Sequence, residues 1–172
     1  MRHSGYSIKR ITRLGLFTTI ALAIYYAESL LPPLVPIPGI KLGLANIITL
    51  FLIKNASLKD AFLVLLVRIL IATFLFGQAM SLLYSLAGGI CSLLAMFLVH
   101  KFLQGHFTIL TGIFGALFHN LGQLLVAMLL VSSVAPLAYL PFFVLSSLLT
   151  GAFTGLCAHF ASAKLSVFRD LH

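Results

Sequence analysis

The sequence predicts an all-α polytopic membrane protein, a bundle of six transmembrane helices with both termini in the cytoplasm. Of its 172 residues, 61% are hydrophobic and only 8% are charged, whereas a soluble domain is closer to half apolar and one-quarter charged. A small soluble domain leaves too much surface exposed to hide such an excess. One compact bundle accounts for residues 1–172, so we expect a single membrane domain. The apolar residues fall into six stretches that we interpret as spans, at about 14–31, 40–53, 61–76, 79–99, 107–131 and 137–160.

The basic residues orient these spans. Cytoplasmic loops of membrane proteins carry an excess of Lys and Arg, so the net charge of +8 sets the topology and does not indicate nucleic-acid binding. With the N-terminus inside, only Lys41 lies on the outer side, and Arg68 lies within a span. This bias favours six spans over five or seven and predicts a multi-pass protein of the cytoplasmic membrane. The cytoplasmic basic residues are then Arg2, Lys9, Arg10, Arg13, Lys54, Lys59, Lys101, Lys164 and Arg169.

The first stretch follows a basic segment, as the apolar core of a secretory signal peptide does. The apolar run 14–31 is too long for such a peptide, and cleavage after Ala27 would put Tyr25 where a small residue is required. We therefore expect a retained first span, which Pro32 and the three prolines after it close.

The second stretch, 40–53, is short. Its 14 residues cover about 21 Å as a helix, against a hydrocarbon core of about 30 Å. The Pro-rich segment before it is therefore expected to dip below the outer surface, where non-helical backbone needs protein or a water-filled cavity around it. This predicts an outward-facing cavity near Pro32–Lys41. The alternative is a short, poorly delimited helix.

Polar residues separate the remaining stretches at 54–60, 77–78, 100–106 and 132–136. Four of the spans also carry small residues on one face, which lets helix backbones approach closely in lipid. We expect most of these stripes to pack inside the bundle, and one is a candidate docking face for a partner subunit. The stripes are Ala23-x-x-x-Ala27, Ser81-x-x-x-Ser85-x-x-x-Gly89, Gly112-x-x-x-Ala116 and Gly151-x-x-x-Gly155.

Arg68 is the most informative polar residue because it lies near the middle of the third stretch. Arginine stays charged, and a charge inside a span is costly and marks a functional site by default. Glu28, at the outer end of the first span, is the only acid on that side. Two interpretations stay open: an Arg68–Glu28 ion pair that fixes helix packing, or an Arg68 that holds an anionic ligand group, with Glu28 as its resting counter-ion.

His119, Asn120 and Gln123 lie within about one turn of the fifth span. His119 and Gln123 are four residues apart and share a helix face. Because lipid cannot satisfy these side chains, we expect them to point inward, either into an interhelical hydrogen-bond network or onto a ligand. A metal site is not expected, since this helix has no second His or acid at ligand spacing.

With the predicted topology, polar residues of five helices converge at the middle and outer side of the bundle, which favours one polar site that opens outward. The candidate ligand-binding residues are Arg68, Lys41, Asn46, His119, Asn120, Gln123, Glu28, Tyr84 and Gln78.

Several kinds of chemistry are excluded. The chain has three acids, Glu28, Asp60 and Asp170, so no carboxylate cluster can hold Mg-diphosphate or two metal ions. It has no Walker loop and no G-x-S-x-G motif, and Cys91 and Cys157 lack metal-binding spacing. We expect no catalytic residue, metal or cofactor, and no ATP hydrolysis by this chain alone.

Some strings of residues are specific enough to suggest a family. They are Pro38-Gly39-Ile40-Lys41-Leu42-Gly43-Leu44-Ala45-Asn46-Ile47-Ile48-Thr49-Leu50, Leu83-Tyr84-Ser85-Leu86-Ala87-Gly88-Gly89 and Gly115-Ala116-Leu117-Phe118-His119-Asn120-Leu121-Gly122-Gln123. Together with the surroundings of Arg68, Leu140-Pro141 and Thr150-Gly151, they resemble the membrane family called heptaprenyl diphosphate synthase component I, also called the Gx transporter family. The resemblance covers nearly the whole chain.

The resemblance implies similarity to the S components of energy-coupling factor (ECF) transporters, small six-helix proteins that capture a ligand from outside. S components dock through small residues of their first helix onto a transmembrane coupling subunit that a pair of ATPases drives, and Ala23 and Ala27 match that pattern in kind. Prenyl synthases bind Mg-diphosphate with Asp-rich motifs. This chain has none, so in such an enzyme it would be at most an accessory subunit.

The leading hypothesis is a substrate-binding subunit of a transporter for a small anionic molecule, such as a vitamin-like or flavin-type compound, a quinone precursor or an isoprenoid phosphate. Arg68 and Lys41 would supply charge, and Tyr84 with the segment Pro32–Pro38 would cover the ligand. Asn46, His119, Asn120 and Gln123 would orient it by hydrogen bonds. The alternatives are a non-catalytic membrane subunit of a heptaprenyl diphosphate synthase and a stand-alone membrane carrier.

Overall fold

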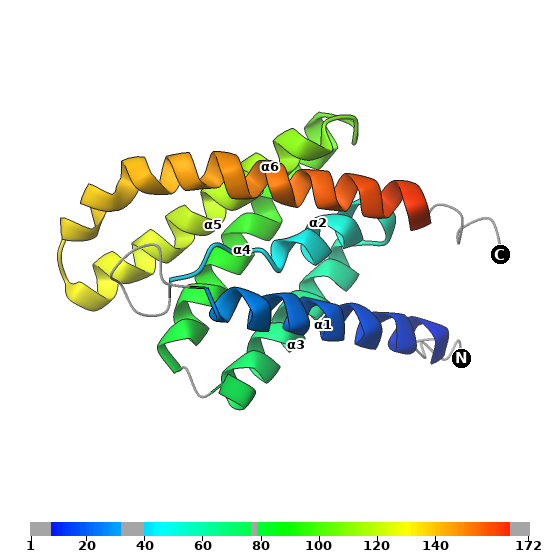
Figure 1. Ribbon diagram of the computed structural model, residues 1–172, viewed down its shortest axis with the longest axis horizontal. Helices are drawn as coiled ribbons and strands as arrows, with labels where there is room; N and C mark the ends of the chain where they lie inside the picture. The colour runs from blue at the N-terminus through cyan, green and yellow to red at the C-terminus, as the bar shows by residue number, and fades with distance from the viewer. Residues whose placement is uncertain (1–7, 32–39, 77–78, 166–172) are drawn as a thin grey trace, which may run out of the picture.

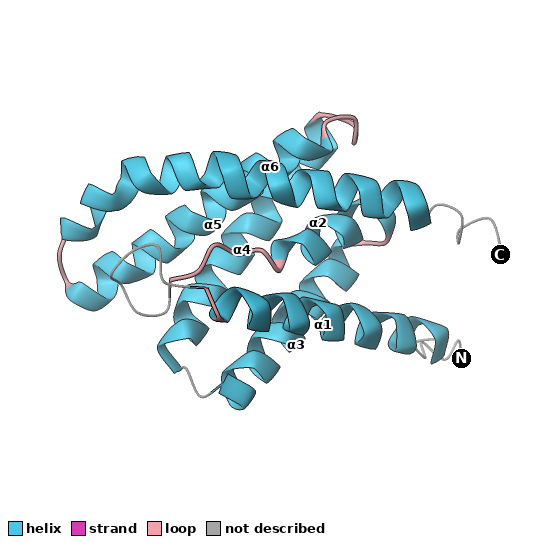
Figure 2. Ribbon diagram, in the orientation of Figure 1, coloured by secondary structure: helices cyan, strands magenta, loops and turns pink. Residues whose placement is uncertain are grey.

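The computed structural model describes residues 8–31, 40–76 and 79–165, and this part of the chain is helical with no strand. It contains six α-helices and one short 3-10 helix, η1, that leads into the last of them, and Figures 1 and 2 show how the labelled helices are arranged. The all-α prediction is therefore confirmed. The elements are α1 (Ile8–Ser29), α2 (Asn46–Asn55), α3 (Leu58–Phe76), α4 (Ala79–Phe102), α5 (Thr108–Val131), η1 (Ala135–Tyr139) and α6 (Leu140–Leu165).

The short helix α2 forms the centre of the bundle. It packs against all five other α-helices, and seven of its ten residues are buried. The other helices surround it: α5 packs closely on both α4 and α6, whereas α1 lies at the edge, packs mainly on α2 and α3, and reaches α4 through the Tyr25–Ser81 hydrogen bond (Figure 1). A half-length helix can remain in the interior because its neighbours, not lipid, surround its ends.

The predicted second span, 40–53, is wrong at its start. Residues Ile40–Ala45 are not helical, and α2 begins only at Asn46. Gly43 has a φ of +79°, a left-handed conformation that glycine adopts without steric cost. The side chain of Glu28 accepts the N–H groups of Gly43 and Leu44, so these groups need no helical partners. The ten-residue helix covers only about 15 Å. The outward-facing cavity expected near Pro32–Lys41 stays a prediction, since residues 32–39 lie outside the described part of the chain.

The other helices match the predicted spans and extend beyond several of them. α1 begins six residues before the predicted 14–31, α3 begins at Leu58, α4 continues to Phe102 and α6 continues to Leu165. Each extension includes basic residues, such as Arg10, Lys59 and Lys101. Helical backbone hydrogen bonding continues into these polar residues, so the helix does not end where the apolar run ends.

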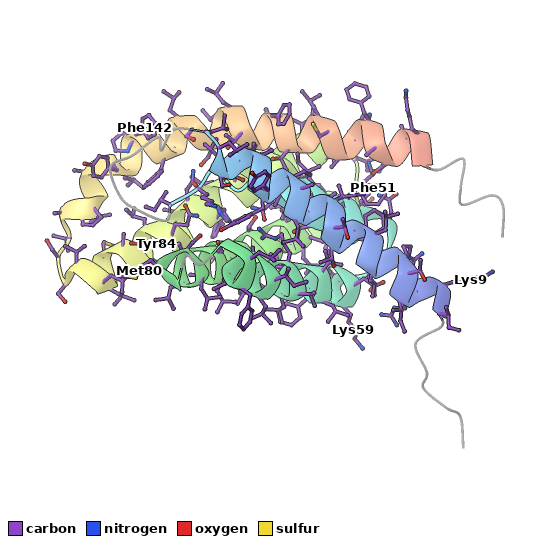
Figure 3. The ribbon with its side chains drawn as sticks, turned by 60° about the horizontal axis from the view of Figure 1, so that its bottom comes forward. Lys9, Phe51, Lys59, Met80, Tyr84 and Phe142 are labelled. Carbon is purple, nitrogen blue, oxygen red and sulfur yellow. The ribbon has the colours of Figure 1, made fainter. Side chains whose placement is uncertain are left out.

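One end of the bundle collects the basic residues. Arg10 of α1 pairs with Asp60 of α3, Lys54 of α2 donates to Thr108 of α5, and Asn55 of α2 donates to Ser162 of α6. Figure 3 shows Lys9 and Lys59 at this end and Met80 and Tyr84 at the opposite end. This is the arrangement that the positive-inside pattern requires of a protein that spans a membrane.

Three helices in the described part are long and apolar enough to cross a membrane, over Met80–Phe102, Thr108–Val131 and Ala135–Lys164. This finding supports a membrane protein. The count of six spans, the N-in orientation and the choice of the cytoplasmic membrane stay predictions.

Small residues bring α5 and α6 into backbone contact. A Cβ atom on Gly112 would meet the backbone of Gly151 and Gly155, and one on Gly151 would meet the backbone of Ile113. In the same way a Cβ on Gly122 would lie 2.8 Å from the Ala87 carbonyl oxygen of α4. Three of the four predicted stripes, those in α4, α5 and α6, are buried inside the bundle, whereas Ala23 and Ala27 of α1 are exposed.

The ion pair at the basic end should contribute measurably to stability. Nε and Nη2 of Arg10 donate to Oδ1 of Asp60 at 2.9 and 2.6 Å, and the Asp60 side chain is only 6% exposed. The change Arg10→Gln leaves a buried carboxylate without its cation, so we expect a loss of about 1–3 kcal/mol in the free energy of unfolding. Arg13→Gln, at an exposed position one turn further along α1, is the control and should change it by less than about 0.5 kcal/mol. Equal losses in the two variants would contradict this role.

Candidate functional site

The site begins with Glu28, in the last turn of α1. Its side chain is 5% exposed, and its two carboxylate oxygens accept the backbone N–H groups of Gly43 at 2.7 Å and Leu44 at 2.9 Å. Charge-assisted hydrogen bonds of this kind are strong. Glu28 therefore holds the non-helical segment before α2 against the end of α1.

Two buried cations lie beside this carboxylate and share one aromatic ring. Lys41 Nζ lies 3.6 Å from the centroid of the Tyr25 ring, and Arg68 Cζ lies 5.8 Å from it. The Tyr25 hydroxyl is 2.9 Å from Ser81 Oγ of α4, which fixes the ring between α1 and α4. A cation over a ring face is stabilised by up to about 2 kcal/mol when desolvated, which is less than a buried charge needs.

Neither cation has a direct anionic partner in the described part of the chain. The one salt bridge there is Arg10–Asp60, so the Arg68–Glu28 ion pair considered from the sequence is not formed. Arg68 is 4% exposed and interacts with Glu28 only across a longer distance. Lys41 Nζ is buried and has no hydrogen-bond partner among the described residues.

A second polar group consists of Asn46, His119 and Gln123, which we call the amide–imidazole triad. Asn46 Nδ2 lies 3.2 Å from His119 Nδ1, and Gln123 Nε2 lies 3.1 Å from His119 Nε2. All three side chains are at most 3% exposed. A neutral imidazole donates from one nitrogen and accepts at the other, so one amide must present its oxygen to the ring and the other its NH2 group.

The triad leaves hydrogen-bonding capacity unused. Asn46 Oδ1 and Gln123 Oε1 are buried without a partner among the described residues. The single ring proton of neutral His119 can satisfy only one of these oxygens. Because a buried acceptor without a partner is costly, the remaining oxygen is suited to an N–H or O–H group of a ligand.

Two glycines hold the imidazole ring on both sides. A Cβ on Gly43 would lie 2.7 Å from His119 Cδ2, and one on Gly88 of α4 would lie 2.9 Å from His119 Cε1. Only residues without a side chain allow this approach. Gly43 thus connects the two groups, since its N–H binds Glu28 and its Cα faces His119, and Arg68 interacts electrostatically with His119 as well.

The structure separates some of the predicted site residues from this cluster. The Asn120 amide donates to Ser147 Oγ at 3.0 Å and to the Phe143 carbonyl oxygen at 3.3 Å, both in α6, so it joins α5 to α6. Tyr84 is buried at the end of the bundle opposite to Lys9 and Lys59 (Figure 3). Gln78 and the segment Pro32–Pro38 lie outside the described residues.

Sequence reasoning missed Tyr25, Gly43 and Gly88 as parts of the site. Tyr25 carries a signal in retrospect, because a tyrosine inside an apolar span needs a partner for its hydroxyl group. The glycines have no such signal, since the role of each depends on what approaches it from another helix. No group of three or more His, Cys, Asp or Glu residues that could hold a metal ion occurs in the described ranges.

The comparison with family models identifies the chain. The model described as heptaprenyl diphosphate synthase component I matches residues 17–161, a range that includes every element of the site. No curated protein and no solved structure matches the chain. The protein therefore belongs to the heptaprenyl diphosphate synthase component I family.

Proposed function

We propose that this protein is the membrane substrate-binding subunit of a transporter, similar to the S components of ECF transporters, and that it captures a small anionic molecule. The observation that carries this proposal is the pair of buried cations, Arg68 and Lys41, that have no direct anionic partner in the described part. A buried charge without a partner costs several kcal/mol, and a bound anion removes that cost.

The remaining polar groups supply orientation. The amide–imidazole triad presents a buried oxygen without a partner among the described residues, and α2 begins at Asn46, a member of the triad. The N-terminus of a helix carries partial positive charge and favours anions. In transporters of known structure, interrupted helices inside the membrane form substrate sites in this manner.

In this proposal a partner subunit supplies the energy for transport, since the sequence has no ATPase motif and no acid pair that could couple transport to protons. The exposed face of α1 is the candidate docking surface. Gly15 and Thr19, like Ala23 and Ala27, are exposed at a spacing of four residues, and an apolar groove of about 440 Å³ lies next to them between α1 and α3. Such a stripe allows close approach of a partner helix in lipid, here that of an ECF coupling subunit.

Retention of the native molecule tests the proposed function directly. The wild-type protein, purified gently from its native membrane, is expected to retain a small organic molecule with an acidic group, which mass spectrometry of the extract can identify. Co-purification of a membrane coupling subunit with an ATPase pair would support transport. If the protein instead retains only bulk lipid and no such complex forms, the proposal is wrong.

Bulky residues on the docking stripe should block assembly without affecting the fold. Ala23→Leu with Ala27→Leu adds volume at two exposed positions of α1, so thermal stability should stay within about 0.5 kcal/mol of the wild type. Pull-down of the membrane partner should fall at least about tenfold, because close helix packing is lost. Ala163→Leu, at an exposed position of α6, is the matched control and should leave the pull-down unchanged. Unchanged pull-down in the double variant would exclude this face.

The family description favours one second function, that of a non-catalytic membrane subunit of a heptaprenyl diphosphate synthase. This reading predicts co-purification with a soluble synthase that carries the Asp-rich Mg-diphosphate motifs. It also predicts a prenyl diphosphate or a prenyl chain as the retained molecule. The same purification therefore distinguishes the two functions.

A further inference from the structure

We infer that the anion site formed by Arg68 and Lys41 takes a single negative charge, such as that of one carboxylate, and discriminates against sulfate-like and diphosphate groups. This inference rests on the proposed function, since it specifies the charge of the ligand that the same site binds.

The inference follows from a complete count of charges near the site. Arg68 and Lys41 contribute two positive charges and Glu28 contributes one negative charge. The sequence contains only two other acids: Asp60 is paired with Arg10 at the basic end of the bundle, and Asp170 belongs to the cytoplasmic C-terminal segment by the predicted topology. With Glu28 ionised, the state that its two backbone N–H donors favour, the site carries one uncompensated positive charge.

Because these charged groups are buried, their net charge determines which anion the site can hold. Arg68 and Glu28 are 4% and 5% exposed, and Lys41 Nζ is fully buried, so neither water nor salt screens them well. A monoanion brings the buried group to neutrality. A dianion replaces one net positive charge with one net negative charge and also loses more hydration on entry.

A diphosphate would need a metal ion to offset its charge, and the described residues offer no cluster that could hold one. Magnesium is bound through carboxylates, whereas both oxygens of Glu28 accept backbone N–H groups. The contacts of Lys41 are consistent with a position beside its ammonium group that the carboxylate of a ligand would occupy. Its ammonium group lies over the Tyr25 ring and donates no hydrogen bond to the described residues, so its three N–H donors are available.

Simple anions can test the charge preference without knowledge of the ligand. The purified full-length protein is heated in detergent at constant ionic strength with formate, sulfate or pyrophosphate as the probe. Unfolding is followed with a thiol-reactive dye, because Cys91 and Cys157 are free and half-buried. We expect formate to raise the unfolding midpoint of the wild type by about 2–6 °C and the two multivalent anions to raise it by less than half as much.

Charge variants make the test specific. Lys41→Gln makes the empty site neutral and should abolish the formate effect, whereas Lys164→Gln, at an exposed position of α6, should retain it. Glu28→Gln raises the net charge to two, so sulfate should now stabilise at least as well as formate. Circular dichroism checks that each variant is folded, and Arg68→Gln should behave like Lys41→Gln if Glu28→Gln does not fold.

The inference is overturned if sulfate or pyrophosphate stabilises the wild type more than formate does, or if Lys41→Gln leaves the formate effect intact. Failure of the proposed function looks different. In that case the wild type and the charge variants respond to formate as expected, but the protein retains no acidic organic molecule and no membrane partner.

Discussion

Arg68→Met is expected to abolish retention of the native molecule without destabilising the protein. Removal of one partner from a buried, charge-assisted contact costs about 2–5 kcal/mol of binding, which is about 30-fold or more in affinity. The empty protein should not lose stability, because Lys41 and Glu28 then balance each other and Arg68 has no salt-bridge partner among the described residues to leave behind. Mass spectrometry of the retained molecule and dye-monitored unfolding measure the two effects on the same samples.

The alternative role of Arg68 predicts the opposite result. If Arg68 stabilised the bundle through Glu28, its removal would leave the buried Glu28 carboxylate without the positive charge of Arg68. That loss would cost about 3–5 kcal/mol of stability. Arg68→Lys is the matched control, since it keeps the charge but not the planar donor group, and should weaken retention less than Arg68→Met. A large loss of stability with normal retention would make Arg68 a packing residue.

Gly151→Ala is expected to be among the most destabilising single-methyl changes in the described helices, together with Gly112→Ala and Gly155→Ala. The added Cβ would meet the backbone of Ile113 and the Gly112 carbonyl oxygen, and backbone atoms cannot rotate away as a side chain would. Overpacking costs about 1–3 kcal/mol where side chains can adjust, so we expect about 3 kcal/mol or more here. This corresponds to a fall of roughly 6–12 °C in the unfolding midpoint.

Gly15→Ala is the matched control for this change. Gly15 also lies in a helix, but a Cβ there would have no neighbour within 4 Å. Alanine is the better helix former by about 0.5–1 kcal/mol, so this variant should be slightly more stable than the wild type. If both variants shift the midpoint in the same direction, close contact between α5 and α6 does not determine stability.

Glu28 connects the two parts of the proposed function. Its neighbour Ala27 belongs to the exposed stripe of α1, and its carboxylate holds Gly43, which lies against the imidazole of His119. α1 lies at the edge of the bundle, packs mainly on α2 and α3, and reaches α4 through the Tyr25–Ser81 hydrogen bond.

The sequence by itself was sufficient to predict the helical class, the approximate helices and the polar residues that turn inward. Each of these depends on local properties. Apolar length and the absence of strand patterns define the helices, and the high cost of a polar side chain in lipid requires Arg68, His119 and Gln123 to avoid it. The short second helix followed from length alone, although its first residue did not, because Gly43 and Glu28 together decide where helical hydrogen bonding begins.

Only the tertiary structure decided which partners these residues have. Helical periodicity places His119 and Asn120 on adjacent faces, but their partners, Asn46 and Ser147, lie 73 and 27 residues away in the chain. The same holds for the small-residue stripes: all of them permit close packing, yet those of α4, α5 and α6 are buried and that of α1 is exposed. The chemistry of a side chain determines which groups it can bind, whereas the packing of distant helices determines which groups lie next to it. For that reason the uncompensated charge at Arg68 and Lys41 could be identified only from the tertiary structure.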